Sequence, residues 1–251
     1  MQINLTGKKA LVTGSSKGIG LAIAKALHAE GCDIAFNSRN SEELIHIAKQ
    51  FPGSIAVAGD VTNQKDANRI IMEVIKSFGK LDILVCNVGG GSSVLFADET
   101  GEDWQRIFSL NLWSTINIVS AAKNELALNS GVIICISSIC GLEVVEGAPI
   151  SYSAAKAALH SYVRGMARPL GKQGIRINAI APGNILFDNS VWSRKLIENN
   201  TAVKAMLEEK VSLGVLGKPE DVANLTTYLV SDIASFVTGT VWTIDGGQVH
   251  G

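Results

Sequence analysis

A tyrosine and a lysine lie four residues apart in the stretch Tyr152-Ser153-Ala154-Ala155-Lys156. Two side chains at that spacing share one face of a helix. A free tyrosine has a pKa of about 10 and exchanges protons poorly at neutral pH. One nearby cation, at an effective dielectric of about 20, contributes about 4 kcal/mol, enough to lower that pKa by roughly three units. The spacing therefore favours Tyr152 as a general acid or base, although an amphipathic helix with a surface lysine would show the same pattern.

Three further polar residues could serve the same chemistry. Ser137 and Ser138 follow the apolar run 131–136, and a hydroxyl at the end of such a strand can polarise a carbonyl oxygen, although either serine could instead cap the loop. Asn111 lies among apolar neighbours in a helical stretch, where a buried amide needs hydrogen-bond partners. It either locks a helix distortion or holds a water molecule for proton transfer.

A glycine-rich turn near the start of the chain is typical of dinucleotide binding. The apolar run 10–12 leads into Thr13-Gly14-Ser15-Ser16-Lys17-Gly18-Ile19-Gly20 and then into a helical pattern. Such a turn lets backbone N–H groups and a helix N-terminus face a pyrophosphate, which approaches closely where side chains are absent. A second glycine turn, Asn87-Val88-Gly89-Gly90-Gly91, follows the strand pattern at 81–86 and could lie over the same cofactor.

Residue types at the end of the second strand, 33–37, favour NADP(H) over NAD(H). An acidic residue there would accept hydrogen bonds from the ribose of NAD, but the chain reads Ser38-Arg39-Asn40. Arg39 can form charge-assisted bonds to a 2′-phosphate, and Lys17 of the first turn can assist. The alternative is that both cations are solvated surface charges.

The third strand also ends in a candidate cofactor contact. Asp60 and Val61 follow that strand and could meet the adenine ring. Equally, Asp60 could cap the helix that comes next, since aspartate is a favoured helix-capping residue.

The elements that must position these residues alternate between strand and helix patterns. Apolar runs typical of strands lie at 10–12, 33–37, 54–58, 81–86, 131–136, 175–180 and 240–247. Helical patterns between them predict parallel βαβ units. We therefore expect an α/β protein with a single-domain, Rossmann-type, doubly wound parallel sheet of seven strands and helices on both faces. The segment 184–215 shows no strand pattern and is expected to form a substrate lid.

The helical stretches carry start signals. Ser151 is expected to cap a helix over about 151–170, and Ser41 to cap the helix after the second strand. A long helical stretch over about 101–128 is interrupted at Asn111. The tyrosine and lysine therefore lie in the first turns of their helix.

Size and charge exclude several classes of protein. With 251 residues and a mass of 26.5 kDa, the chain can bury one large core. A net charge of -1 at pH 7 and a pI near 6.4 give no basic excess for nucleic acid or an anionic membrane. No apolar run reaches the roughly 20 residues of a membrane span, so a cytoplasmic protein is expected. The 4 cysteines lack CxxC or disulfide-like spacing and the 4 histidines are scattered, which predicts reduced thiols and no metal site.

Taken together, these motifs resemble the short-chain dehydrogenase/reductase family over essentially the whole chain. The family's order and approximate spacing are found in Thr13-Gly14, Gly18-Ile19-Gly20, Asn87-Val88-Gly89, Asn111, Ser138, Tyr152, Lys156 and Pro182-Gly183. The joint match is specific, whereas each motif alone is not. The resemblance implies a Rossmann-type sheet and, by default, a homotetramer.

The resemblance also implies roles for individual residues. Tyr152 would exchange the proton, Ser138 would hold the substrate oxygen, and Lys156 would lower the tyrosine pKa while binding the nicotinamide ribose. Asn111 would hold a water molecule between Lys156 and solvent. Ser138 fits the family better than Ser137 because two residues and a glycine follow it. The expected cofactor-binding set is Gly14, Ser16, Lys17, Gly18, Ile19, Arg39, Asp60, Val61, Asn87, Gly89, Tyr152, Lys156, Pro182, Gly183 and Ile185, the last through its backbone at the nicotinamide carboxamide.

Two positions depart from the family pattern. Cys86 stands where the usual Asn-Asn-Ala-Gly has its first asparagine, which keeps the turn but removes one side-chain amide. Phe187 stands where many relatives carry a threonine after the Pro-Gly turn, which removes one expected cofactor hydrogen bond. Neither change touches the residues of proton transfer.

The general likeness is greatest to 3-oxoacyl-(acyl carrier protein) reductases, through the segments 217–222 and 238–247. The first hypothesis is therefore an NADP(H)-dependent oxidoreductase that moves a hydride between nicotinamide and a carbonyl or secondary alcohol. One alternative is a dehydrogenase of sugar or nucleotide-sugar alcohols. Another is a non-catalytic, NADP(H)-sensing binding protein, which the full set of proton-transfer residues disfavours.

Residues near the expected substrate pocket favour two kinds of substrate. A partly apolar pocket is indicated by Val144, Val145, Phe187 and Trp192. A phosphate or an acidic carrier could be attracted by Arg194 and Lys195. The sequence leaves acyl and sugar substrates both open.

Overall fold

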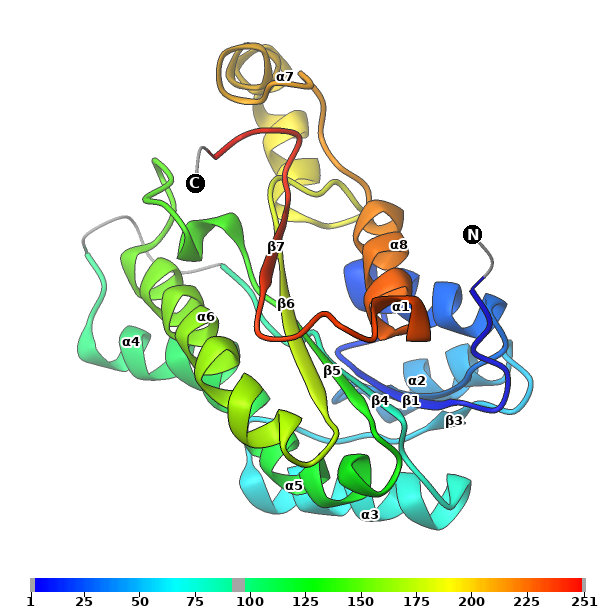
Figure 1. The fold of residues 1–251 in the computed structure, drawn as a ribbon. Coiled ribbons are helices and arrows are strands. Elements are labelled where there is room, and N and C mark those ends of the chain that lie inside the picture. Colours follow the sequence, from blue (N-terminus) through cyan, green and yellow to red (C-terminus); the bar gives the residue numbers. More distant parts are fainter. Residues whose placement is uncertain (1–2, 92–97, 250–251) are drawn as a thin grey trace.

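The centre of the molecule is a parallel sheet of seven strands. The computed structural model describes residues 3–91 and 98–249. Neighbouring strands pair in the order β3-β2-β1-β4-β5-β6-β7, and every adjacent pair is parallel (Figure 1). The strands are β1 (Lys9–Thr13), β2 (Asp33–Asn37), β3 (Ile55–Ala56), β4 (Ile83–Cys86), β5 (Val132–Ile136), β6 (Arg176–Pro182) and β7 (Val241–Ile244). The predicted Rossmann-type sheet is confirmed.

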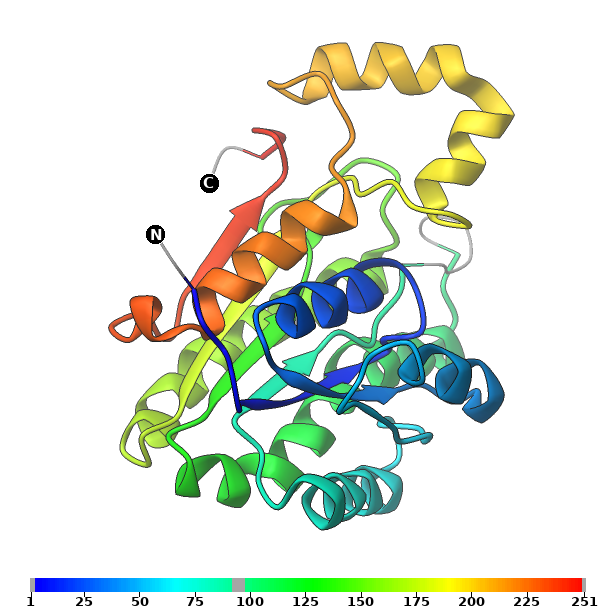
Figure 2. The same cartoon turned by 90° about the vertical axis from the view of Figure 1, so that its right-hand side faces the viewer.

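Helices cover both faces of the sheet. One layer contains α1 (Gly18–Ala29), α2 (Ser41–Ala48) and α8 (Pro219–Val230) (Figures 1 and 2). The other contains α3 (Gln64–Phe78), α5 (Ser114–Leu128) and α6 (Ile150–Gly171), with α4 (Gly101–Phe108) beside α6. Each layer shares an apolar cluster with one face of the strands, which explains why strand residues are apolar on both faces.

The central strands end at the same level. β4 and β5 are buried at every position, and their register runs from Ile83 beside Val132 to Cys86 beside Cys135. The residues that follow these strands therefore lie next to one another at the carboxyl edge of the sheet. Open α/β sheets bind ligands at this edge.

The long helical stretch breaks where the sequence predicts. A π-helical turn, η1 (Ser109–Trp113), separates α4 from α5 and contains the fully buried Asn111. Single π turns inside helices are frequent at functional sites, because the wider turn moves side chains and backbone out of the regular pattern.

Three predicted helix starts need correction. The cap of α2 is Asn40, whose side chain accepts from the N–H groups of Glu42 and Glu43, and Ser41 is already helical. Asn63 caps α3, while the Asp60 carboxylate accepts hydrogen bonds from the backbone and hydroxyl of Thr62. An asparagine oxygen takes the capping position in both cases.

The third error concerns the helix of Tyr152. α6 begins one residue before Ser151, and its N-cap position is Pro149, which has no side chain that could cap. Ser151 lies inside the first turn, and its hydroxyl hydrogen-bonds Glu99. Pro169 lies in the last turn of α6.

The segment 184–215 forms a helix that the sequence did not indicate. α7 (Val191–Lys210) is kinked at Asn199 and projects beyond the carboxyl ends of the strands (Figures 1 and 2). Val203, Leu207 and Val211 form a small apolar cluster of their own there. The helix α7 lies apart from the layers of the sheet.

Two negative findings apply to residues 3–91 and 98–249. No helix in these ranges is both long and apolar enough to cross a membrane. No three His, Cys, Asp or Glu side chains gather there in a way that could hold a metal ion.

Candidate active site

Four elements bring their polar residues together at the carboxyl edge of the sheet. A side-chain carbon placed on Gly89, after β4, would lie 2.9 Å from Asn111 Oδ1 of η1 and 3.1 Å from Lys156 Nζ of α6. A carbon placed on Gly91 would lie 3.6 Å from the ring of Tyr152. The glycine turn after β4 therefore passes directly over the predicted proton-transfer residues, and at position 89 a side chain would crowd Asn111 and Lys156.

The side chain of Asn111 takes the helix-locking role. Its Nδ2 donates to Gly90 O at 3.1 Å and to Ile107 O at 3.0 Å, and its Oδ1 accepts from Gly90 N at 3.0 Å. The amide is thus engaged at both donors, with one lone pair of Oδ1 left over. Asn111 ties the π turn to the glycine turn that borders Lys156.

The structure separates the two adjacent serines. Ser137 Oγ lies 2.6 Å from His160 Nε2, so that hydroxyl is occupied inside the protein. Ser138 accepts a hydrogen bond from Cys140 N at 3.2 Å and lies close enough to Tyr152 to lower the pKa of the phenol. Ser138 is therefore the serine that is free to act beside the tyrosine.

His160 connects the serine loop to the helix of Tyr152. Its Nδ1 lies 3.1 Å from Gly141 O, which can only accept, so Nδ1 carries the proton and Nε2 accepts from Ser137. Burial is the main reason that the pKa of His160 is lowered to about 4. The neutral imidazole thus fastens the end of β5 to α6, one helical turn beyond Lys156.

The predicted effect of Lys156 on Tyr152 is not found in the chain alone. Burial raises the pKa of Tyr152 to about 12, and only the hydrogen bond with Ser138 opposes it. Lys156 Nζ lies 5.7 Å from the centre of the tyrosine ring and donates to Ile136 O at 3.0 Å. Burial also lowers the pKa of Lys156 to about 8, which makes it a weaker source of positive charge than an exposed lysine.

The glycine-rich turn has the shape of a phosphate cradle. A side-chain carbon on Gly20 would lie 2.4 Å from both Asn87 Nδ2 and Gly14 O, and Gly14 and Gly18 have φ of +63° and +56°. Asn87 Nδ2 donates to Thr13 O and Gly14 O at 3.0 Å each, so the turns after β1 and β4 are joined. The N-terminus of α1 carries no side-chain cap, which leaves its N–H groups open to an anion.

The expected nucleotide-binding residues line the neighbouring strand ends. Asn37, at the end of β2, is buried, and its Oδ1 has no hydrogen-bond partner in the protein. Lys17 and Arg39 are exposed, and neither forms an ion pair within 3–91 and 98–249. An unpartnered buried acceptor beside two free cations fits the adenosine half of a dinucleotide, where the acceptor meets hydroxyls and the cations meet phosphate.

The loop of Asp60 and Val61 is held from two sides. Asp60 N donates to the Asp66 carboxylate at 2.6 Å, and Asn117 Nδ2 of α5 donates to Val61 O at 3.2 Å and Thr62 O at 2.9 Å. Val61 is buried. This loop follows β3, on the side of the sheet where Asn37 lies.

The turn after β6 leaves a backbone edge free. Pro182 ends β6, and Gly183 N donates to Ile244 O at 3.0 Å. The bridge between Ile185 and Gly217 uses Leu186 N and Asn184 O, so the peptide groups of Ile185 itself stay outside it. This is the arrangement that a backbone contact to a carboxamide requires.

Comparison with known proteins identifies the family. Residues 14–249 match the family model described as enoyl-(acyl carrier protein) reductase. The chain is 35% identical to the 3-oxoacyl-(acyl carrier protein) reductase FabG of Rickettsia conorii over 98% of this chain and 99% of that protein. It belongs to the short-chain dehydrogenase/reductase family.

Two solved structures share the fold of this chain. L-sorbose reductase from Gluconobacter frateurii, in complex with NADPH and L-sorbose, matches with a TM-score of 0.93, 30% identity and full coverage of both chains. A 7α-hydroxysteroid dehydrogenase in complex with NADH and 7-oxo glycochenodeoxycholic acid matches with a TM-score of 0.89 and 32% identity, covering 100% of this chain and 97% of that one. The protein is accordingly an NAD(P)-dependent oxidoreductase of CH–OH and C=O groups.

The two departures from the family pattern leave the core of the site intact. Cys86 is buried, and its thiol packs against Cys135 and Thr115. Phe187 packs on the glycine-rich turn, where a side-chain carbon on Gly18 would lie 2.7 Å from the ring. The family's threonine position is thus filled by an aromatic ring that joins the segment 184–215 to the glycine-rich turn.

The other residues named from the sequence for the substrate pocket have different surroundings. Trp192 packs on the apolar cluster of α7, and Lys195 Nζ lies 4.7 Å from the centre of its ring. Val144 is 92% exposed. Among the described residues, Phe187 and Trp192 thus pack on different apolar clusters, and Val144 belongs to neither.

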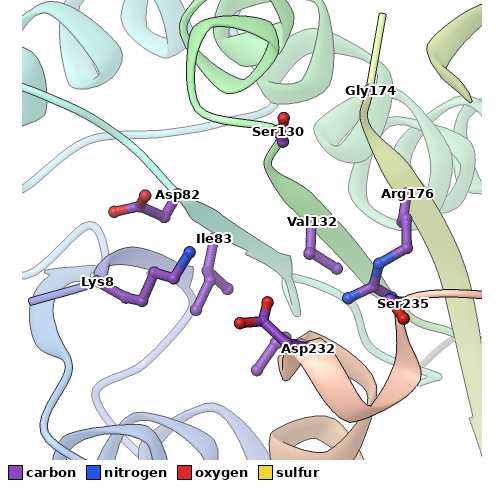
Figure 3. Close-up of a pocket in the computed structure, with 10 residues that line it drawn as sticks. Lys8, Asp82, Ile83, Ser130, Val132, Gly174, Arg176, Asp232 and Ser235 are labelled. Atoms are coloured by element: carbon purple, nitrogen blue, oxygen red, sulfur yellow. The ribbon is translucent and has the colours of Figure 1, made fainter. Parts of the chain in front are cut away.

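A separate cavity lies at the opposite edge of the sheet. It measures about 240 Å³ and is bordered by Lys8, Asp82, Arg176 and Asp232, near the amino ends of the strands (Figure 3). The Arg176 guanidinium is occupied there, since it donates to Leu229 O at 2.8 Å at the end of α8. The cavity lies away from the carboxyl edge of the sheet, where Tyr152 and Lys156 lie.

Sequence reasoning missed two residues that hold the site in place. Glu99 bonds the first turn of α6, and His160 bonds Ser137. His160 lies four residues after Lys156, a spacing that could have placed it on the same helix face. Glu99 carried no such signal, because its partners lie 51 and 52 residues further along the chain.

Proposed function

We propose that the protein is an NADP(H)-dependent reductase of carbonyl compounds, similar to 3-oxoacyl reductases, with Tyr152 as the proton donor. The main support is one observation: the glycine turn after β4 passes within contact distance of Asn111, Lys156 and Tyr152, while Ser138 lies close enough to the phenol to influence its pKa. A substrate oxygen that accepts from Ser138 would lie beside the phenol. Reduction of that carbon needs a proton at this oxygen.

Each residue of the site has a separate role in the proposed reaction. Nicotinamide, when bound, exchanges the hydride with the substrate carbon. Tyr152, whose pKa is raised to about 12, is protonated at neutral pH and gives its proton to the substrate oxygen. Ser138 orients that oxygen. Lys156 holds positive charge near the phenol, and the free lone pair of Asn111 Oδ1 can bind a water molecule that returns the proton.

The preference for NADP(H) is supported by charge. Lys17 and Arg39 are exposed at the strand ends beside Asn37, and no acidic residue stands at 38–40. Two cations favour a 2′-phosphate, whereas a carboxylate would favour the free ribose hydroxyl. The remaining contacts of the cofactor would come from the residues expected from the sequence around Gly14, Asn87 and Ile185.

The decisive test is Tyr152→Phe, which removes the phenolic proton and keeps the ring. We expect turnover of an acetoacetyl thioester with NADPH to fall at least about 100-fold, because general acid catalysis is lost. The dissociation constant of NADPH, followed by fluorescence titration, should stay within about threefold.

The matched control is Tyr162→Phe, the same chemical change further along α6, where the side chain packs into the core. Its turnover should equal that of the wild type. Undiminished turnover in Tyr152→Phe, or an equal loss in both variants, would rule out the assigned role.

A sugar or nucleotide-sugar alcohol is the second candidate substrate. It is favoured by the positions of Phe187 and Trp192, which pack separately, on the glycine turn and on the α7 cluster. A panel of acyl thioesters, sugar alcohols and ketoses separates the two candidates by kcat/KM. Preference for ketoses over thioesters would overturn the first choice of substrate while leaving the reaction class intact.

We also propose that the segment 184–215 acts as a substrate lid and that the protein is a homotetramer in the cytoplasm. The lid is supported by its contact with the cofactor turn through Phe187. The tetramer is supported by exposed apolar side chains on the α4–α5 stretch, namely Trp113 and Leu128. Sedimentation equilibrium tests the assembly, and a monomer at micromolar concentration would contradict it.

A further inference from the structure

The N-cap residue of α6, the helix that carries Tyr152, provides no side-chain hydrogen bond to the first turn. That residue is Pro149, and its side chain cannot accept a hydrogen bond. The first N–H groups of a helix have no partner within the helix, so they need an acceptor from elsewhere. In α6 these groups lie immediately before Tyr152.

Glu99 supplies that acceptor from a distant part of the chain. Its Oε2 accepts from Ile150 N at 3.0 Å, and its Oε1 accepts from Ser151 N at 3.1 Å and from the Ser151 hydroxyl. One carboxylate thus satisfies two backbone donors and one side-chain donor. A negative charge at this position also complements the positive end of the helix dipole.

Glu99 is itself held firmly. The next residue, Thr100, caps α4 through a reciprocal pair with Asp103: Asp103 N donates to Thr100 Oγ1 at 3.2 Å, and Thr100 N donates to Asp103 Oδ2 at 3.1 Å. The backbone beside Glu99 is therefore fixed by α4, which packs against α6. The carboxylate is presented to α6 from a rigid support.

We infer that Glu99 is a positioning residue for Tyr152: by closing the first turn of α6, it fixes the direction of the phenol relative to Ser138. Tyr152 follows the two capped residues directly, so fraying of this turn would move its Cα and ring. This inference rests on the proposed role of Tyr152 as proton donor. Glu99 itself touches neither the phenol nor Ser138 in the contacts described above.

The test is a series of substitutions at Glu99 with NADPH and an active carbonyl substrate. Glu99→Ala should lower kcat by about 10- to 100-fold, since misplacement of a reacting group costs rate steeply. Glu99→Gln keeps one oxygen acceptor and should recover part of that loss. The dissociation constant of NADPH should change by less than about threefold in both variants, because the glycine-rich turn is untouched.

Two controls separate positioning from general damage. Glu102→Gln removes the same charge from an exposed site in the first turn of α4 and should leave kcat unchanged. Ser161→Gly weakens the exposed interior of α6 without touching its first turn, and it should also leave kcat unchanged. A kcat of Glu99→Ala within twofold of the wild type, or a parallel loss of NADPH binding, would overturn the inference.

Hydrogen exchange keeps the inference distinguishable from the proposed function. In Glu99→Ala the amides of Ile150 and Ser151 should exchange at least tenfold faster, while amides in the middle of α6 keep their protection. Unchanged exchange would refute the capping role. If the wild type turned over no carbonyl or alcohol, the proposed function would fail, and this measurement would still decide the role of Glu99.

Discussion

At the scale of single residues, the site depends on side chains whose partners are fixed before any substrate arrives. Hydrogen bonds to other protein groups hold the side chains of Asn111, Ser137 and Asn87. The Ser138 side chain lies beside Tyr152. Tyr152 and Lys156 were predictable because their spacing is local to one helix. Glu99 was not, because a contact between distant residues leaves no local pattern in a single sequence.

His160 leads to a prediction about stability and pH. Its pKa is lowered from 6.5 to about 4 in the folded protein, so the unfolded chain binds the proton more tightly. The contribution of the neutral imidazole to the free energy of unfolding is therefore complete above pH 6.5, and it is lost as the pH falls toward 4. Between pH 7 and pH 5 we expect a loss on the order of 2 kcal/mol in the free energy of unfolding from this residue.

Urea denaturation of the wild type and of His160→Gln at both pH values measures this effect. The glutamine variant should be less stable than the wild type at pH 7. Its free energy of unfolding should fall less between pH 7 and pH 5, because glutamine at position 160 does not titrate. His46→Gln, at an exposed site on α2, serves as the control and should keep the wild-type difference. Equal losses in wild type and His160→Gln would refute a buried neutral imidazole.

At the scale of elements, the strand and helix order followed from the hydrophobic periodicity, and so did the break at Asn111. Boundaries were less predictable where two residues compete to cap a helix, as Asn40 and Ser41 do. α7 was missed because only a few of its residues are buried, so it shows little apolar pattern. Its position could not be read from the sequence, because it depends on contacts such as that of Phe187 with Gly18.

The contact of Phe187 with the glycine-rich turn leads to a prediction about the rates of cofactor exchange. Phe187→Ala removes the ring that packs on the glycine-rich turn, so we expect NADPH to bind and leave faster, each by roughly 3- to 10-fold. The dissociation constant should change less than either rate. Stopped-flow fluorescence measures both rates, with Met72→Ala, an exposed apolar truncation on α3, as control. Unaltered rates would show that the ring does not gate the turn.

At the scale of the whole molecule, the strand order explains the place of the site. Chain connections run outward from β1 in one direction and from β4 in the other, so the sheet reverses its order between these two strands. The glycine-rich turn follows β1, the second glycine turn follows β4, and Asn87 joins them. Crevices at such reversal points are the ligand sites of open α/β sheets.

Binding at this crevice should stabilise the entire fold. At about 100 times its dissociation constant a ligand adds about 2.7 kcal/mol, which raises the melting temperature of a chain of this size by about 5–10 °C. At equal concentrations NADPH should give a larger shift than NADH in the wild type. Arg39→Ala should abolish that difference, whereas Lys49→Ala, at the far end of α2, should preserve it. A larger shift with NADH would refute the proposed cofactor preference.

The long separation between Glu99 and the helix it caps has a consequence for how the chain acquires activity. The middle of α6 can become helical through local contacts, but its first turn is completed only when a loop of 51 residues has closed. Non-local closure of this kind comes late, after local structure has formed. During refolding, circular dichroism should therefore recover before enzymatic turnover, because turnover also needs this non-local contact to be in place.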